Sequence, residues 1–237
     1  MFNISIKTIL INLFLVVIAV GTSILIYNQY SVDNDLSNID LEKAKKLMIV
    51  AHPDDETLWG GAHLLEDDYL VVCITCGPNK TRRKEFEKVM KETGDQYIML
   101  GYPDKVLGMR SNWKEEKNQI YSDLKQIIEL KDWELIVTHN KDGEYGHIHH
   151  KKTHSIVLDV YNDLNKEYPL YFFGKYYTKG KLAKLDKKPD EIDPILYKEK
   201  VNNLIEIYKS QAFIKTTFNQ MFPYEDWIKY ENEIAKD

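Results

Sequence analysis

The sequence has few cysteines, and their number and spacing bear on which chemistry is possible. Its two cysteines, Cys73 and Cys76, stand in a C-x-x-C spacing. A zinc site built on such a pair needs two further ligands, typically a second Cys pair, which this chain lacks. The segment around them is typical of a strand, on which residues three apart point to opposite faces. We therefore expect buried, inert thiols rather than redox or zinc chemistry.

An excess of positive charge is also missing. The formal net charge is −5, and binding to a phosphate backbone needs a basic face, so nothing here indicates a nucleic acid partner. Lysines are common, but acidic residues are interleaved with them, which is typical of a solvated surface. The chain contains no internal repeat and no low-complexity segment. Its 237 residues are enough for one large domain or two small ones.

Near the N-terminus, residues 8–27 form a run of twenty uncharged, mostly apolar residues. As a helix this run would be about 30 Å long, the thickness of a bilayer's hydrocarbon core. It predicts one N-terminal transmembrane helix, with residues 1–30 as the membrane anchor. A cleaved signal peptide is the alternative, because Ala19-Val20-Gly21 resembles a cleavage site. However, the apolar run continues beyond that point, which favours an uncleaved anchor.

The charges flanking this run predict its orientation. Lys7 precedes it, whereas Asp33 and Asp35 follow it, so the positive-inside rule places the main domain outside the cytoplasm. If the run is cleaved, the domain is secreted instead. Residues 31–44 are polar and weakly patterned and are predicted to be a tether. Residues 45–237 are predicted to form the catalytic domain.

Beyond the tether, short apolar runs alternate with helical patterns. The alternation predicts βαβ units and an α/β domain with a largely parallel sheet. The carboxyl ends of parallel strands lie at one edge, where open α/β folds bind ligands. The expected strands are residues 47–51, 69–75, 97–100, 135–138 and 169–173, and the expected helices are 57–65, 82–92, 114–130, 149–164 and 198–208.

The first of these strands is followed by an unusual set of side chains. The apolar run 47–51 stops at His52-Pro53, where proline forces the chain to turn, and Asp54-Asp55-Glu56 comes next. An imidazole and three carboxylates at a strand end favour metal binding. Acidic residues also cap helix N-termini, and this alternative would account for one of the carboxylates. It would not account for the histidine.

A second polar cluster follows the fourth predicted strand. Five of the seven histidines fall between His139 and His154. In a helix beginning near His147, that residue and His150 share one face. His149 and His154 are expected to be solvated helix residues, and His139 is expected to support the site or lie in the loop.

Together the two clusters can supply a metal site. His52, Asp55 and one histidine of the second cluster would provide the three protein ligands that catalytic zinc requires. Two histidines and one carboxylate also suit other divalent ions, Fe(II) included.

The sequence Ala51-His52-Pro53-Asp54-Asp55-Glu56 matches the signature of the PIG-L (LmbE-like) family of metal-dependent de-N-acetylases. Other elements resemble that family in the same order, over about residues 46–211. These are Arg82-Arg83-Lys84-Glu85, Leu100-Gly101-Tyr102-Pro103-Asp104, His147-Ile148-His149-His150 after a Gly-Glu-Tyr-Gly segment, and Tyr208-Lys209-Ser210-Gln211. The resemblance implies a Rossmann-like three-layer α/β fold with a mostly parallel central sheet.

The resemblance also implies roles for individual residues. The implied zinc ligands are His52, Asp55 and His150, the general base is Asp54, His147 supports the oxyanion, and Arg82 and Asp104 contact the sugar. The chemistry of amide hydrolysis agrees, because a protonated His147 could donate to the oxyanion. Family members remove acetyl groups from N-acetylglucosamine units. We therefore expect a zinc-dependent hydrolase, with Fe²⁺ as the alternative ion, that deacetylates an N-acetylglucosamine-containing glycoconjugate. The alternatives are a hydrolase of a different amide and a surface glycan-binding protein with weak or no activity.

Overall fold

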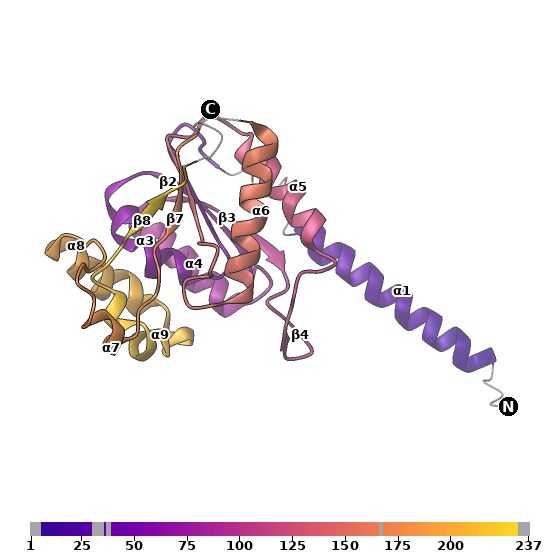
Figure 1. Cartoon of the computed structure of the whole chain (residues 1–237). Coiled ribbons are helices and arrows are strands. Elements are labelled where there is room, and N and C mark those ends of the chain that lie inside the picture. Colours follow the sequence, from indigo (N-terminus) through magenta and orange to yellow (C-terminus); the bar gives the residue numbers. More distant parts are fainter. Residues whose placement is uncertain (1–5, 30–35, 37–38, 166–167, 232–237) are drawn as a thin grey trace.

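The computed structural model describes residues 6–29, 36, 39–165 and 168–231. A six-stranded sheet organises the domain (Figure 1). Five strands run parallel, and the last pairs antiparallel with its neighbour at one edge. Across the sheet the order is β3 (Gln96–Tyr102), β2 (Tyr69–Thr75), β1 (Lys46–Val50), β6 (Ile136–Thr138), β7 (Leu170–Phe173) and β8 (Trp227–Lys229).

Helices cover both faces of the sheet, so the predicted three-layer α/β fold is confirmed. Successive residues of β1 point to opposite sides. Met48 and Val50 join the core that contains α3 (Asp55–Glu66) and α4 (Lys80–Thr93), and Leu47 and Ile49 join the other. The second core contains α5 (Lys117–Ile128) and α6 (Ile148–Leu164). This arrangement follows from the period of two in a strand that is buried on both faces.

The C-terminal part is less regular than the sequence predicts. In place of one helix over residues 198–208, α8 (Pro194–Glu199) passes into a π-helical turn, Lys200–Leu204, and then a 3₁₀ turn, Ile205–Ile207. The buried side chain of Lys200 reaches Leu58 O at 2.9 Å and Glu225 Oε1 at 2.7 Å. These partners are distant in the sequence, so the local pattern does not reveal the break.

Several short elements complete the domain. The hairpin of β4 (Lys105–Val106) and β5 (Met109–Arg110) follows β3. In the C-terminal part, α7 (Lys179–Leu182), the 3₁₀ turn Lys209–Gln211, α9 (Ile214–Thr217) and the 3₁₀ turn Asn219–Met221 lie on the side of α3 and α4 (Figure 1).

The predicted membrane anchor is helical but is not confirmed as a membrane span. The first helix, α1 (Ile6–Gln29), exposes its apolar side chains, for example Leu13 at 60%. Within the described part of the chain, no helix combines the length and the apolar character needed to cross a bilayer, so the predicted transmembrane helix is not supported. Most of the predicted tether, residues 30–35 and 37–38, lies outside the described residues. The domain boundaries and the extracytoplasmic location stay predictions.

Candidate active site

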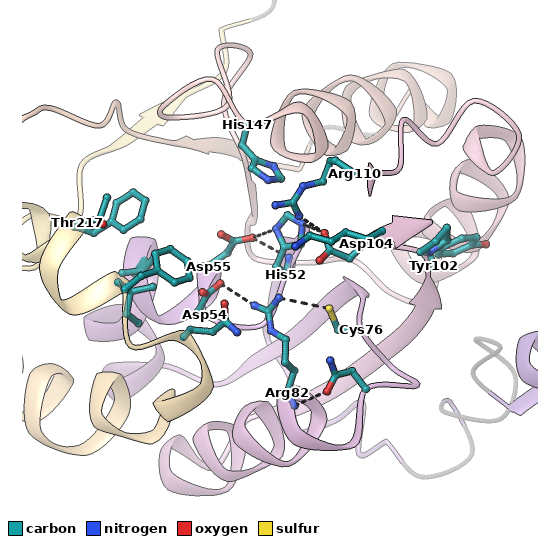
Figure 2. Close-up of a pocket in the computed structure, with 18 of the residues that line it drawn as sticks. His52, Asp54, Asp55, Cys76, Arg82, Tyr102, Asp104, Arg110, His147 and Thr217 are labelled. Atoms are coloured by element: carbon teal, nitrogen blue, oxygen red, sulfur yellow. Dashed lines mark hydrogen bonds and ion pairs between the residues drawn. The ribbon is translucent and has the colours of Figure 1, made fainter. Parts of the chain in front are cut away.

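The turn between β1 and α3 places Asp54 in an unusual backbone conformation. Its φ of 110° is positive, which is rare outside glycine and is common at functional sites. The Asp54 side chain makes no capping hydrogen bond to α3, so helix capping does not account for this carboxylate. Instead Asp54 lines the pocket, where Oδ1 lies 3.5 Å from Arg82 Nη2 (Figure 2).

Asp55 connects the two clusters that the sequence predicts. Its Oδ2 accepts the backbone N–H of His52 at 2.8 Å and lies 3.2 Å from His52 Nδ1. Its Oδ1 lies 3.2 Å from His150 Nε2. All three side chains are buried. The structure therefore brings together the three residues implied as metal ligands, from two segments nearly one hundred residues apart.

Glu144 contacts the imidazole rings of His150 and His139. Its Oε2 contacts Nδ1 of His150 and lies 3.0 Å from Nδ1 of His139. The other ring nitrogen of His139, Nε2, accepts the Ala51 N–H at 3.0 Å. Both nitrogens of His139 are thus engaged by protein groups, which favours the predicted supporting role, although His139 also forms a possible metal-binding group with Asp55 and His150. Burial raises the pKa of Glu144, but the neighbouring imidazoles of His139 and His150 outweigh burial and lower it to about 2.

Overlapping groups of these residues could hold a divalent cation, namely His52, His147 and His150; Asp55, His139 and His150; and His52, Asp104 and His149. His150 Nε2 is buried and has no hydrogen bond of acceptable geometry among the described residues, although Asp55 is near. Burial by itself lowers the pKa of His150, yet the carboxylates of Asp55 and Glu144 raise it to about 10. A positive charge is therefore favoured between these carboxylates, and a metal ion would displace the proton. Two imidazoles and one carboxylate suit zinc and Fe(II) alike.

His149 is fully buried, so the expectation that it is solvated is wrong. Its Nδ1 lies 2.9 Å from His52 Nε2, and its Nε2 lies 2.7 Å from Ser111 O. Its ring stacks on Trp113 with the centroids 4.1 Å apart and the planes at 5°. The first turn of α6 is covered by the loop after β5, which buries adjacent residues on two sides. His154 is also partly buried, with Nδ1 3.0 Å from His139 O.

His147 lines the pocket at the start of α6 (Figure 2). Its Nδ1 accepts the backbone N–H of His149 at 3.2 Å, so the proton of the ring sits on Nε2. Burial, together with the neighbouring imidazoles of His150 and His52, lowers the pKa of His147 to about 2. The expected protonated form of His147 is therefore disfavoured in this structure. A neutral ring still offers its Nε2–H to the pocket.

Arg82 and Asp104, the implied sugar contacts, both line the pocket but already have protein partners. Arg82 contacts Pro53 O and lies 3.6 Å from Cys76 Sγ. Its position at the start of α4 is fixed by Asn79, whose side chain accepts the Arg82 backbone N–H at 3.2 Å. Asp104 Oδ1 lies 3.4 Å from His52 Nε2 and pairs with Arg110 of β5 (Figure 2). Their role as sugar contacts stays a prediction.

The pocket has a volume of about 890 Å³, with polar residues on one side and apolar residues of the C-terminal part on the other. Sequence reasoning missed several contributors. His149 was visible in the histidine cluster, but no local signal separates the loop and apolar residues from ordinary surface or core positions. The missed residues are Arg110, Ser111, Trp113, His149, Phe213, Ile214 and Phe218.

The two cysteines are free and buried, and burial raises the pKa of both, as expected for inert thiols.

A family model described as "PIG-L: GlcNAc-PI de-N-acetylase" matches residues 47–161, a range that contains His52, Asp55 and His150. The chain belongs to the PIG-L family. An uncharacterised protein of Acanthamoeba polyphaga mimivirus is 32% identical over 211 residues, which is 81% of this chain and 80% of the viral one.

Two curated PIG-L relatives are 1D-myo-inositol 2-acetamido-2-deoxy-α-D-glucopyranoside deacetylases. The one from Corynebacterium diphtheriae is 22% identical and the one from Streptomyces griseus is 25% identical, over 53% and 50% of this chain. The matches span about half of these relatives, 55% and 49%. The solved structure of the pseudoaglycone deacetylase Dbv21 has a TM-score of 0.55 at 16% identity, over 73% of this chain and 85% of that one, which shows a shared fold. The family and these relatives together support a deacetylase.

Proposed function

We propose that this protein is a metal-dependent hydrolase that removes the acetyl group from an N-acetylglucosamine-containing glycoconjugate. The observation that carries this proposal is the convergence of His52, Asp55 and the buried His150, with the carboxylate of Asp54 lining the same pocket as His52 and Asp55. Two relatives are named for an acetamido sugar joined to inositol, which supports a substrate of this kind. Zinc is the proposed ion, with Fe²⁺ as the alternative.

A divalent ion held by these three residues would act as a Lewis acid and would activate a water molecule. Asp54 is placed to take the proton from that water and to return it to the departing amine. Burial, followed by the charge of Asp55, raises the pKa of Asp54 above its usual range, and Arg82 opposes this rise. A carboxylate of raised pKa is a stronger proton acceptor, so this environment suits a general base.

The remaining residues have simpler roles. The Nε2–H of His147 would donate to the oxygen that gains negative charge as the amide carbonyl is attacked. Cleavage of the C–N bond then gives acetate and a free amine. Arg82 and Asp104, on the polar side of the pocket, are proposed to contact sugar hydroxyls. The apolar side formed by Phe213 and Phe218 is proposed to accommodate part of the aglycone.

The test is acetate release from a panel of glucosamine conjugates by protein loaded with zinc or with Fe²⁺. Each N-acetylated compound is paired with the same compound carrying an O-acetyl group, so that esterase activity is recognised. We expect release from at least one N-acetyl conjugate, with loss after chelation and recovery when the ion is restored. Binding of the conjugates without acetate release would instead indicate a glycan-binding protein. Release from unrelated amides alone would reject the sugar substrate.

A further inference from the structure

We propose that His149 is a positioning residue that sets the ring tautomer of His52 and so presents His52 Nδ1 to the metal. The inference concerns the metal site and therefore rests on the proposed function. It goes beyond the ligand set, because His149 is proposed to act on the ring of His52 and not on the ion. It starts from four hydrogen-bonding atoms in series, which are Ser111 O, His149 Nε2, His149 Nδ1 and His52 Nε2.

The direction of each hydrogen bond follows from the chemistry of its ends. A backbone carbonyl accepts and cannot donate, so the proton in the 2.7 Å contact with Ser111 O sits on His149 Nε2. In a neutral imidazole the other nitrogen then carries a lone pair. His149 Nδ1 therefore accepts, and His52 Nε2, 2.9 Å away, must donate. The His52 ring is thereby fixed as the Nε2–H tautomer.

This tautomer leaves the lone pair of His52 Nδ1 facing Asp55 Oδ2 at 3.2 Å. Two acceptors that face each other at this distance are matched by a cation between them. In the opposite tautomer, an Nδ1–H of His52 would donate to Asp55 and occupy the position that the metal needs. Asp55 Oδ2 already accepts the His52 backbone N–H at 2.8 Å, so it does not depend on that second donor.

Asp104 also lies near His52 Nε2 but is the weaker acceptor in this arrangement. Its Oδ1 is 3.4 Å away, compared with 2.9 Å for His149 Nδ1, and it is paired with Arg110. His149, in contrast, is fully buried and is held by stacking on Trp113. The Trp113 ring is itself fixed, because its Nε1–H donates to Pro103 O at 2.8 Å. The shorter contact and the fixed ring favour His149 as the group that sets the tautomer.

Two substitutions separate positioning from packing. His149→Phe keeps a ring that can stack on Trp113 but removes the acceptor. His149→Asn loses the stacked ring but can place its Oδ1 close to the position of Nδ1. If His149 sets the tautomer, the asparagine variant should resemble the wild type and the phenylalanine variant should not. If His149 only fills space, the order should be reversed.

The first readout is the tautomer of His52 in metal-free protein, from two-bond ¹H–¹⁵N NMR at mildly alkaline pH. We expect the Nε2–H form in the wild type and in His149→Asn, and a large share of the Nδ1–H form in His149→Phe. The second readout is zinc affinity by competition with a chelator. Partners that orient a metal-binding histidine are typically worth about 10–100-fold in affinity, so His149→Phe should lose roughly that factor.

An unchanged His52 tautomer together with unchanged zinc affinity in His149→Phe would overturn the proposal. If that variant does not fold, His149→Asn decides alone, because loss of the Nε2–H form there would also overturn it. Neither readout requires turnover. The acetate assay on the wild type tests the proposed function separately, so the two ideas can fail independently.

Discussion

The backbone N–H of Asp54 donates to Glu56 Oε2 at 3.0 Å, which links the proposed base to a carboxylate two residues away. The positive φ of Asp54 costs about 1–3 kcal/mol and persists only where the surroundings impose it. Glu56 is fully buried, and its other oxygen accepts hydrogen bonds from the hydroxyls of Thr57 and Tyr208. Tyr208 belongs to the C-terminal part, so that part helps to hold the turn between β1 and α3 that carries Asp54.

Tyr208→Phe should therefore affect both stability and turnover. Removal of the hydroxyl leaves Glu56 with one partner fewer in a buried site, which typically costs about 1–3 kcal/mol. We expect the free energy of unfolding to fall by that amount, and kcat to fall while metal content is retained. Urea unfolding, acetate release and elemental analysis measure the three quantities. Tyr121→Phe, on the outside of α5, is the matched control and should stay within about 0.5 kcal/mol of the wild type. Equal effects of the two substitutions would contradict this role of Tyr208.

His150→Ala should abolish metal binding, whereas His154→Ala, one turn further along α6, should retain it. His150 Nε2 faces Asp55, and its Nδ1 is held by Glu144. His154 instead contacts a backbone carbonyl, His139 O. Elemental analysis after dialysis against zinc gives the metal content, and circular dichroism verifies folding. Loss of metal from a folded His154→Ala variant would show that the site extends further along α6 than we propose.

Asp95, which lies outside the candidate active site, makes the free energy of unfolding depend on pH. Burial raises its pKa from 3.8 to about 6, although hydrogen bonds from Thr93 and the Tyr69 N–H oppose the rise. The folded state thus binds the proton more tightly than the unfolded state does. The stability that this tighter proton binding contributes is fully present below the pKa of Asp95 in the unfolded state. It is lost as the pH rises through the pKa of Asp95 in the folded state.

Asp95→Asn should remove this loss, because the amide keeps an acceptor for the Tyr69 N–H and does not ionise. The free energy of unfolding of the variant relative to the wild type should increase as the pH rises from about 4 to about 6, by at most about 3 kcal/mol. Urea unfolding on both sides of this window measures the difference. Asp186→Asn, at an exposed position, is the control for the chemical change. A difference that does not vary with pH would exclude Asp95 as the titrating group.

Much of the fold and of the candidate site could be predicted because the signals are local. The apolar run before His52 specified β1, and the turn at Pro53 placed His52 and Asp55 at the carboxyl edge of the sheet. The parallel topology then brought His150 to the same edge. Each of these steps uses neighbouring residues or the general geometry of βαβ units.

The features that escaped prediction depend on distant partners. β8 has three residues and pairs only at the sheet edge, so no alternation marks it. The π-helical turn begins at Lys200, whose side chain forms an ion pair with the distant Glu225. The burial of His149 depends on Ser111 and Trp113, in a loop before α5. Even the protonation of His147 is set by folding, through the backbone N–H that its Nδ1 accepts.

Asp54→Asn provides the most direct test of the chemistry. Asparagine has nearly the size of aspartate, so the proposed ligands His52, Asp55 and His150 should still bind the metal. Its amide cannot accept a proton at neutral pH, and general-base catalysis is typically worth about 10²–10⁴-fold. We therefore expect kcat to fall by roughly that factor.

The KM of Asp54→Asn should change little, because the sugar contacts are proposed to come from Arg82 and Asp104. The measurement is zinc content beside the kinetics of acetate release from an accepted substrate. Near-normal turnover in a metal-loaded variant would exclude Asp54 as the base. A folded variant without metal would make Asp54 a ligand. The assignments of the two carboxylates would then be exchanged, with Asp55 as the base.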